Sequence, residues 1–434
     1  MRKWCCLFLF SVLVPVAIAQ SLSQPASEQL TLKQAERIAI QNHPQIQAAA
    51  NLAFEAKAQI TEQTSAYYPT AYGDMTGAAA ENNSRITAGA LNSPTVFDKY
   101  ADGFTVTQLI TDFGRTHNLA KSADLHAQAA QENVVTTRED VLLGVDRAYF
   151  GVLKAQALLK VAQETVKERQ LVSDQVTALE RNKIRSGLDV SFANVNLAQA
   201  QLLLIQAQND VDASYAQLAA ALGSSDQRVF QLTEVPLPSA PPADFSGLLQ
   251  EAFQNRPELI SLRSEATSAH LYATAEHDLW FPTVSAAGTA GLAPETPDNS
   301  TLHSPRYAAA GFNINVPIFN GHLFGALRTE ANSRARADDA YLRDMQDTVA
   351  RDVRTAWLDA NSAFQRLSVT EQLLDEANEA LDLAQSRYKL GLSSIVELSE
   401  AQLNQTQAQI QETSARYDYQ TQIATLNFQL GTLQ

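Results

Sequence analysis

The 434-residue sequence predicts a mainly α-helical protein that also contributes strands to a transmembrane β-barrel. Three observations lead to this fold class. The chain contains two copies of one pattern, each copy includes a helix far longer than a globular core requires, and each copy includes short segments in which apolar and polar residues alternate. The order predicted for each half is helix, strand, loop, strand, very long helix, turn and helix.

The duplication is visible as matched phrases at nearly constant spacing. The stretch "QNHPQI" at 41–46 is echoed by "QNRPEL" at 254–259, which lies 213 positions later. From the second predicted strand onward the spacing is 208, because "FTVTQLITDFG" from Phe104 aligns with "FNINVPIFNGH" from Phe312. We interpret the change in spacing as a loop that is five residues longer in the first half.

These matches divide the chain into four segments. Residues 1–19 have a basic start, an apolar run and a small-residue end, which is typical of a secretory signal peptide. The first structural repeat is predicted at 20–230 and the second at 246–434. The proline-rich segment between them, 231–245, cannot continue a helix and is interpreted as a semi-rigid linker.

Each half is predicted to open with a helix that bends at a proline. In the first half this helix spans about Thr31 to Ala66 and breaks near Pro44, where a kink or a new helix start is expected. A second helix, from about Thr116 to Asn182, contains no proline. Its apolar residues step by four and three in a heptad pattern, which predicts coiled-coil packing over roughly 100 Å.

Four segments with a period of two residues are predicted as strands. They lie at about 67–80, 100–112, 281–291 and 306–319. In the last segment Phe312, Ile314 and Val316 share one face, while Asn313 and Asn315 share the other. This alternation is typical of a bilayer-spanning strand, although the edge of a soluble β-sandwich gives the same pattern. We favour the membrane interpretation.

Four strands cannot close a barrel, and an open sheet in lipid would leave unpaired edges. The sequence therefore predicts a homotrimer, because twelve strands from three chains form the smallest closure with a comfortable water-filled lumen. Aromatic residues gather where strands meet helices, as at a membrane–water interface. They are Tyr67, Tyr68, Phe113, Trp280, Phe281 and Phe319. The polar segments 81–100 and 292–307 are predicted as extracellular loops.

Composition limits the classes of function. Loss of Arg2 and Lys3 with the signal peptide changes the formal charge from −15 to −17, which argues against nucleic acid as a partner. Both cysteines lie within that peptide. No catalytic motif is present, and His270 and His277 are interpreted as solvated residues rather than metal ligands. The sequence therefore predicts no enzyme activity and no cofactor.

The chain resembles the TolC-type outer membrane efflux protein family. The resemblance rests on the duplicated order of elements, the two proline bends, "SRYKLGLSSIVELSEAQ" from Ser386 and the closing "LNFQLGTL". It implies a homotrimer with a twelve-stranded barrel in outer-membrane lipid and a long periplasmic helical tunnel. It also implies docking to a periplasmic adaptor protein and an inner-membrane transporter, for efflux or type I secretion.

Two alternatives from other classes remain open at this point. The first is an elongated periplasmic coiled-coil protein, structural or adaptor, that lacks a barrel. The amphipathic strands argue against it. The second is a trimeric surface adhesin, which would place its strands at one end of the chain instead of in both halves.

The turn after the second long helix is the candidate site. "SGLD" at 186–189 aligns with "SIVE" at 394–397, and both match the capping-box pattern that starts a helix. The nearby glycines, Gly187 and Gly391, are displaced by four positions, so the two turns are predicted to differ. Family members often have a basic residue shortly after the turn glycine, but Ser393 lies in that stretch here.

The resemblance implies that acidic residues at this turn line the periplasmic constriction of the tunnel. Glu400 is the main candidate, because Glu397 on the same helix face could instead cap its own helix. Asp189 is expected nearby. Tyr388 is expected to be the hydrogen-bonding partner that holds this end shut. Three copies of these acids would form a ring that attracts cations.

Overall fold

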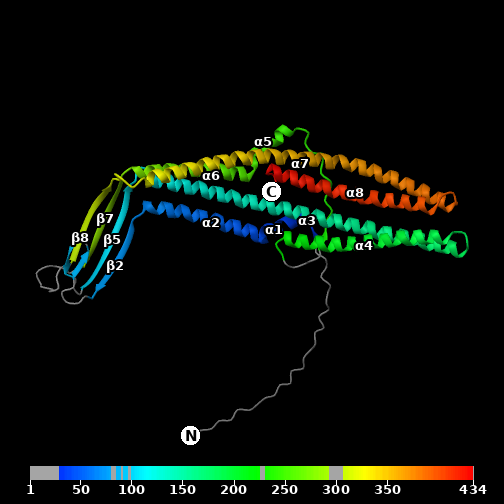
Figure 1. Ribbon diagram of the computed structural model, residues 1–434, viewed down its shortest axis with the longest axis horizontal. Helices are drawn as coiled ribbons and strands as arrows, with labels where there is room; N and C mark the ends of the chain where they lie inside the picture. Colours follow the sequence, from blue (N-terminus) through cyan, green and yellow to red (C-terminus); the bar gives the residue numbers. More distant parts are fainter. Residues whose placement is uncertain are drawn as a thin grey trace, which may run out of the picture.

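The computed structural model describes residues 29–79, 85–88, 91–95, 99–224, 230–292 and 306–433. The molecule is elongated, with a small sheet at one end and long helices running away from it side by side (Figure 1). The predicted signal peptide and much of both predicted extracellular loops lie outside the described residues.

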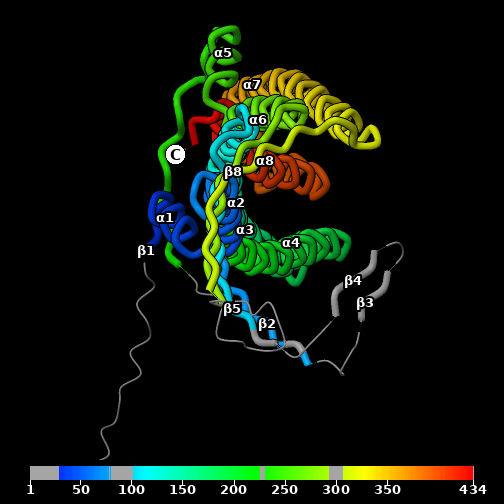
Figure 2. The backbone as a smooth tube through the Cα atoms, turned by 90° about the vertical axis from the view of Figure 1, so that its left-hand side faces the viewer, coloured from blue at the N-terminus to red at the C-terminus, as the bar shows by residue number. Residues whose placement is uncertain are grey.

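The helices form two matched sets. The first half contains α1 (Leu32–Asn42), α2 (Pro44–Thr64), α3 (Arg115–Arg181) and α4 (Gly187–Ala221), and the second contains α5 (Phe245–Asn255), α6 (Pro257–His277), α7 (Leu323–Lys389) and α8 (Ile395–Leu430). The helices α3 and α7 each have 67 residues, and the bounds of α3 agree with the helix predicted from its heptads at about Thr116 to Asn182. Each turns back as a hairpin with the helix that follows it (Figure 1), and seen along the molecule α3 lies beside α4 and α7 beside α8 (Figure 2).

Small residues allow close packing inside the hairpins. On α4 the buried residues Ala193, Ala200 and Ala207 are each seven positions apart, which places one stripe of small side chains along a single face. On α7 the buried alanines at 356, 363, 377 and 384 follow the same period. Little side-chain bulk separates the paired helices along these stripes.

The opening helix breaks at its proline in both halves. His43 ends α1 and begins α2 with extended backbone, and its ring nitrogen Nδ1 accepts a hydrogen bond from the Gln45 N–H at 3.3 Å. Arg256 takes the same place between α5 and α6, with Pro257 as the first helical residue. A proline at this position lacks only an N–H that would have no helical partner.

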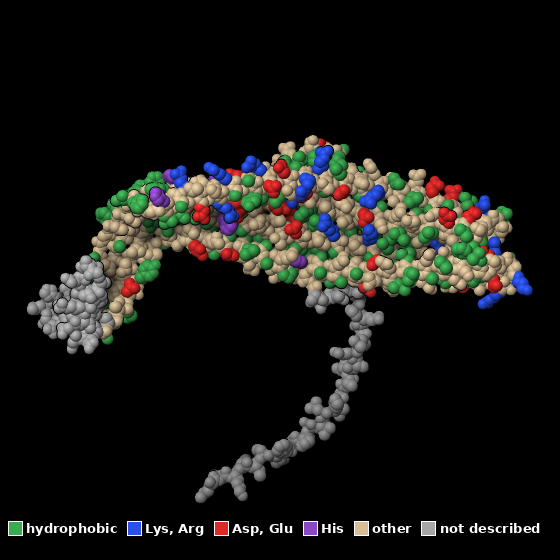
Figure 3. Space-filling view, in the orientation of Figure 1, with side chains coloured by type: hydrophobic (Ala, Val, Ile, Leu, Met, Phe, Trp, Pro, Cys, Tyr) green, Lys and Arg blue, Asp and Glu red, His purple; other side chains and the backbone are tan. Residues whose placement is uncertain are grey.

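The sheet contains four antiparallel strands in the order β2-β5-β7-β8. Their bounds are Thr70–Ala78, Lys99–Thr111, Thr283–Leu292 and Arg306–Asn315. The prediction that the last strand runs to 319 was wrong. Val316 and the residues after it leave the ladder, since Pro317 has no N–H to donate. Charged side chains are sparse over the sheet and dense over the helices (Figure 3).

Strand register keeps the predicted faces together. Val106 pairs with Gly288, which in turn pairs with Ala310, so Val106 and Ala310 lie on one face of the sheet. Ile314 pairs with Val284 on that same face. Asn313 pairs with Ser285 on the other face. The sheet therefore has one mainly apolar and one mainly polar face.

Two short pairings were not predicted. β3 (Arg85–Ala88) and β4 (Leu91–Thr95) form a hairpin within the segment interpreted as an extracellular loop. β1 (Gln29–Leu30) pairs in parallel with β6 (Gln231–Leu232), so the first two residues of the predicted linker belong to a strand. The hydroxyl of buried Tyr149 lies within 2.9 Å of the carbonyl oxygens of Leu30 and Thr233, which fixes this pairing to α3.

Left-handed backbone recurs at matched places in the two halves. Among the described residues, every position with positive φ has a counterpart 208 residues away. The pairs are Phe113 with Gly321, Gly114 with His322, Lys183 with Gly391, and Gly223 with Gly431. Three of these pairs have glycine on one side only. The backbone of the repeat is therefore preserved at turns where glycine is not.

Candidate gate at the helical tip

Two turns lie at the end of the helices farthest from the sheet, one in each hairpin (Figure 1). In the first turn Lys183 has φ +61°, and in the second Gly391 has φ +75°. The Lys183 N–H donates to the carbonyl of Glu180 at 2.7 Å, and the Gly391 N–H donates to that of Tyr388 at 3.0 Å. Both turns thus end their helix with the same left-handed motif.

The prediction that the two turns differ was wrong. It rested on the displacement of Gly187 from Gly391, but Gly187 is the first residue of α4 and does not have positive φ. The position equivalent to Gly391 is Lys183, which adopts left-handed backbone at a cost of about 1–2 kcal/mol.

The helices that follow the turns are capped differently. Ser186 and Asp189 form the full reciprocal box, because each side chain accepts the other residue's backbone N–H, at 3.3 and 3.1 Å. Ser394 accepts the Glu397 N–H at 3.3 Å, but the Glu397 carboxylate instead pairs with Arg387 at 3.1 Å. Only half of the predicted box is therefore present at α8.

Arg185 joins the two hairpins at the tip. Its guanidinium donates a hydrogen bond to the backbone carbonyl of Tyr388 at 2.5 Å and lies 4.1 Å from the centre of the Tyr388 ring. Tyr388 is only 6% exposed, and burial raises the pKa of its phenol. Its hydroxyl has no hydrogen-bond partner among the described residues. The carbonyl and the ring of Tyr388, and not its hydroxyl, make this contact.

Sequence reasoning missed Arg185. A basic residue was sought after the second turn, where Ser393 lies with its hydroxyl buried and without a hydrogen-bond partner in the described part of the chain. The cation comes from the other hairpin, 203 positions before Tyr388. The signal that the sequence offered was its place directly before the Ser186 cap.

Glu400 differs from the other two acids at the tip. It is exposed on α8, and no ion pair or hydrogen bond involves its carboxylate within the described ranges. Asp189 is held by its cap, and Glu397 is held by Arg387. The structure therefore leaves Glu400 with the charge that is least compensated by its own chain.

Polar contacts also connect the two hairpins between the tip and the sheet. Buried Arg169 on α3 donates to the carbonyl of Gln402 at 2.7 Å and to the Thr406 hydroxyl at 2.8 Å. Farther toward the sheet, Lys154 pairs with Asp418 at 2.8 Å. Directional bonds thus join the two hairpins, and others occur inside a hairpin, as where the Ser173 hydroxyl donates to the Asn194 side-chain oxygen at 2.7 Å.

His270 and His277, the two histidines considered as metal ligands, do not contact each other. His270 contacts Asp339 at 3.0 Å, and His277 contacts Asp278 at 3.3 Å. The part of the chain that the structure describes contains no group of three or more side chains placed to bind a metal ion.

One helix in the described ranges, α4, is long and apolar enough by composition to cross a membrane, and little of that stretch is buried. Besides its buried alanine stripe, α4 presents a second stripe in which the residues are also seven apart. Leu188, Val195 and Leu202 are each more than half exposed in the single chain. Heptad spacing of this kind is typical of contact with another helix.

Comparisons with known proteins agree with this architecture. The family model described as "Outer membrane efflux protein" matches residues 37–224 and again residues 248–432. Outer membrane protein TolC of Escherichia coli (strain K12) is 24% identical over 97% of this chain and 86% of the relative. Alkaline protease secretion protein AprF of Pseudomonas aeruginosa is 23% identical over 91% of this chain and 83% of the relative.

A solved structure has the same fold. The outer membrane protein VceC of Vibrio cholerae superimposes with a TM-score of 0.80 at 18% identity, over 92% of this chain and 96% of that one. The two family matches coincide with the two halves of the duplication. The chain therefore belongs to the outer membrane efflux protein family and is an outer-membrane exit duct of an efflux or secretion system.

Proposed function

We propose that three copies of the chain form one duct, with a closed twelve-stranded barrel in the outer membrane and a helical tunnel in the periplasm. The open edges of the sheet, β2 and β8, support this assembly because unpaired strand edges are not tolerated in lipid. The exposed stripe at Leu188, Val195 and Leu202 supports a helix contact between neighbouring copies. Residues 1–19 would direct export as a signal peptide.

The tip of the tunnel is the gate in this proposal, and the single observation that carries it is the contact between Arg185 and Tyr388. This contact is a cross-hairpin bond at the very end of the helices, where a small displacement would widen the opening. Release of the contact would free the α7–α8 turn to move away from the α3–α4 turn. A periplasmic adaptor and an inner-membrane transporter would supply the force that opens it.

The acids at the tip set the charge of the opening. Threefold symmetry brings three copies of Glu400 together, and like charges held close attract cations. Glu397 contributes less because Arg387 neutralises it, and Asp189 is engaged by its cap. The duct is therefore cation-selective, and divalent cations added on the periplasmic side block it.

Single-channel conductance in planar lipid bilayers tests both the gate contact and the ring of acidic residues. Arg185→Ala should raise the conductance several-fold, since it removes the bond between hairpins. Glu400→Gln should weaken the divalent block by about tenfold or more, whereas Glu397→Gln should weaken it less. Arg351→Ala is the matched control, because Arg351 is exposed and, among the described residues, its side chain pairs only with its neighbour Asp352.

Each outcome bears on a separate part of the proposal. Unchanged conductance in Arg185→Ala would mean that the contact does not hold the tip closed. Unchanged block and selectivity in Glu400→Gln would mean that this acid lies on a solvated helix face and not in the ring.

A further inference from the structure

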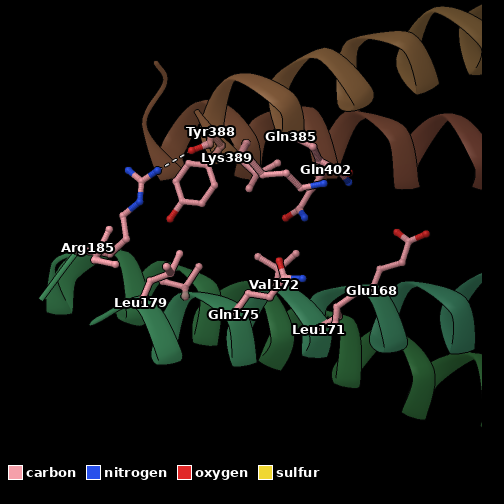
Figure 4. A pocket seen from close by; sticks show the side chains of 13 residues that line it. Glu168, Leu171, Val172, Gln175, Leu179, Arg185, Gln385, Tyr388, Lys389 and Gln402 are labelled. Carbon is pink, nitrogen blue, oxygen red and sulfur yellow. Dashed lines mark hydrogen bonds between the residues drawn. The ribbon is translucent and has the colours of Figure 1, made fainter. Parts of the chain in front are cut away.

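A cavity of about 360 Å³ lies between the two hairpins, and the Arg185–Tyr388 contact lies at one end of it (Figure 4). Its walls come from α3 on one side and from α7 and α8 on the other. Most of the α3 wall is apolar, with Leu171, Val172 and Leu179 facing the space. A volume of this size is at the lower end of those that bind small organic molecules.

Two buried polar groups in this cavity lack partners. The Tyr388 hydroxyl and the Gln402 side-chain amide nitrogen make no hydrogen bond with any described residue. Tyr388 is 6% exposed and Gln402 is 2% exposed, so both are more than nine-tenths buried. Figure 4 shows both side chains directed from the second hairpin toward α3. A buried donor without a partner costs about 1–3 kcal/mol, which a ligand acceptor would recover.

The charges around the cavity favour a negative head group. Arg185 and Lys389 are among its lining residues, and Glu168 is the one acid among the described residues that line it. The Arg185 guanidinium stays next to the Tyr388 ring while it bonds the Tyr388 carbonyl. An anionic acceptor placed near the Tyr388 hydroxyl would therefore meet hydrogen-bond donors and the positive charge of Arg185, which the more distant Asp189 partly opposes.

Water alone is a poor occupant of such a space. The volume corresponds to roughly ten water molecules, and each needs two to four polar partners. The α3 wall offers only Glu168 and Gln175 among the described side chains that line it, so displacement of the remaining water by an apolar group is favourable. The cavity combines the apolar surface and the few convergent donors that are typical of ligand sites.

We propose that this cavity binds a small amphipathic organic anion, with a flat apolar body against Val172 and Leu179 and an acceptor head between Tyr388 and Gln402. An occupant in this position spans both hairpins. It would brace them directly behind the contact that closes the tip.

Saturation-transfer difference NMR on the full chain in lipid nanodiscs tests the proposal, with naphthalene-2-sulfonate as the probe. We expect transfer to the naphthalene protons, and about a tenfold loss of affinity in the double variant Tyr388→Phe, Gln402→Leu. Val172→Trp should abolish binding because it fills the space for the apolar body. A naphthyl trimethylammonium cation, which has the same body but no acceptor, should bind at least tenfold more weakly.

Leu383→Trp is the matched control. It places the same tryptophan side chain on exposed α7 surface outside the cavity and should leave the affinity unchanged. Absence of transfer at millimolar probe would overturn the proposal, as would equal affinity of the double variant and the parent chain. Tyr388→Phe keeps the carbonyl that Arg185 binds, and the measurement requires no ion current. Its result is therefore independent of the gate proposal.

Discussion

Gly223 and Gly431 end their repeats with left-handed backbone, at φ +71° and +69°. A Cβ on Gly223 would lie 2.9 Å from the Cα of His43, and one on Gly431 would lie 2.9 Å from the carbonyl carbon of Asn255. His43 and Asn255 belong to the two matched proline bends, so each repeat ends packed on the bend with which it began. Gly391 is also left-handed but has open space around it.

Gly431→Ala should therefore be far more damaging than Gly391→Ala. At Gly391 only the left-handed backbone opposes a side chain, which costs about 1–2 kcal/mol. At Gly431 the clash with the bend adds about 1–3 kcal/mol. Thermal unfolding of the detergent-purified chain, followed by circular dichroism, measures the difference. Equal losses for the two variants would show that the close approach is relieved by a shift of the bend.

Prediction for single residues succeeded where a residue type has one role within a helical turn. It failed where several residue types can fill the same role. The Ser186 and Asp189 cap was readable from spacing alone, because its atoms lie within one helical turn. The use of glycine as a marker for the tip turn failed at Lys183, because lysine also tolerates left-handed backbone. The contacts of Gly431 with Asn255 depend on tertiary packing, which no local pattern contains.

At the scale of elements, α1 and α3 meet through two carboxyl groups. Asp146 is 4% exposed, and its Oδ1 has no hydrogen-bond partner among the described residues, while the Glu36 carboxyl group lies near enough to interact with it. Burial first, and then the nearby charge of Glu36, raises the pKa of Asp146 to about 8. Burial also raises the pKa of Glu36, which Lys33 partly opposes. The contact is therefore favourable when at least one carboxyl group holds a proton.

This pair makes folding stability fall as pH rises. Asp146 has an unfolded pKa of about 4, so its contribution is fully present below that value and is lost as the pH rises through about 8. Asp146→Asn keeps a hydrogen-bonding side chain without the charge. Its unfolding temperature should match the parent at pH 4 and exceed it increasingly toward pH 8. Parallel curves for parent and variant between these pH values would contradict the role assigned to the pair.

Elements were more predictable than the contacts between them. The lengths of α3 and α7 follow from heptads without proline, and the break at His43 follows from Pro44. The bonds that join the hairpins, such as Arg169 to Gln402, connect residues 233 positions apart. No pattern along the chain specifies which residues meet across that separation.

At the scale of the whole molecule, the sheet separates two environments. Ile314 and Val284 share its apolar face, and Asn313 and Ser285 share its polar face. The edge strand β8 is exposed throughout in the single chain. In the proposed assembly the first face contacts lipid and the second lines water.

Ile314→Asp should therefore lower the amount of inserted protein, while Asn313→Asp should be tolerated. Ile314 lies one residue from the end of β8, where a charge on the lipid face costs about 1 kcal/mol, and the polar face imposes no such cost. Immunoblotting of the outer-membrane fraction measures how much of each variant is inserted. The two variants differ by one position on the same strand, so equal amounts would refute the assignment of the faces.

The duplicated architecture and the family were predictable from the whole sequence. The same order of helices and strands recurs in both halves, and this order is recognisable even though each single motif is weak. The order of strands in the sheet could not be predicted, since strands from both halves pair only after the chain has folded. The tip could be located but not its closing contact. Arg185 and Tyr388 come from different halves and meet only because the two hairpins end at the same level.

Gly223 packs on the bend at His43, and Gly431 packs on the bend at Asn255. Because of these contacts, the two halves can complete their folding at different times during synthesis. The first half can form its contact between Gly223 and His43 as soon as Gly223 has been made, before the second half is made. The second half must wait for Gly431, which follows its bend at Asn255 by 176 residues. Its bend therefore stays uncovered until α6, both strands β7 and β8 and the whole α7–α8 hairpin have been made.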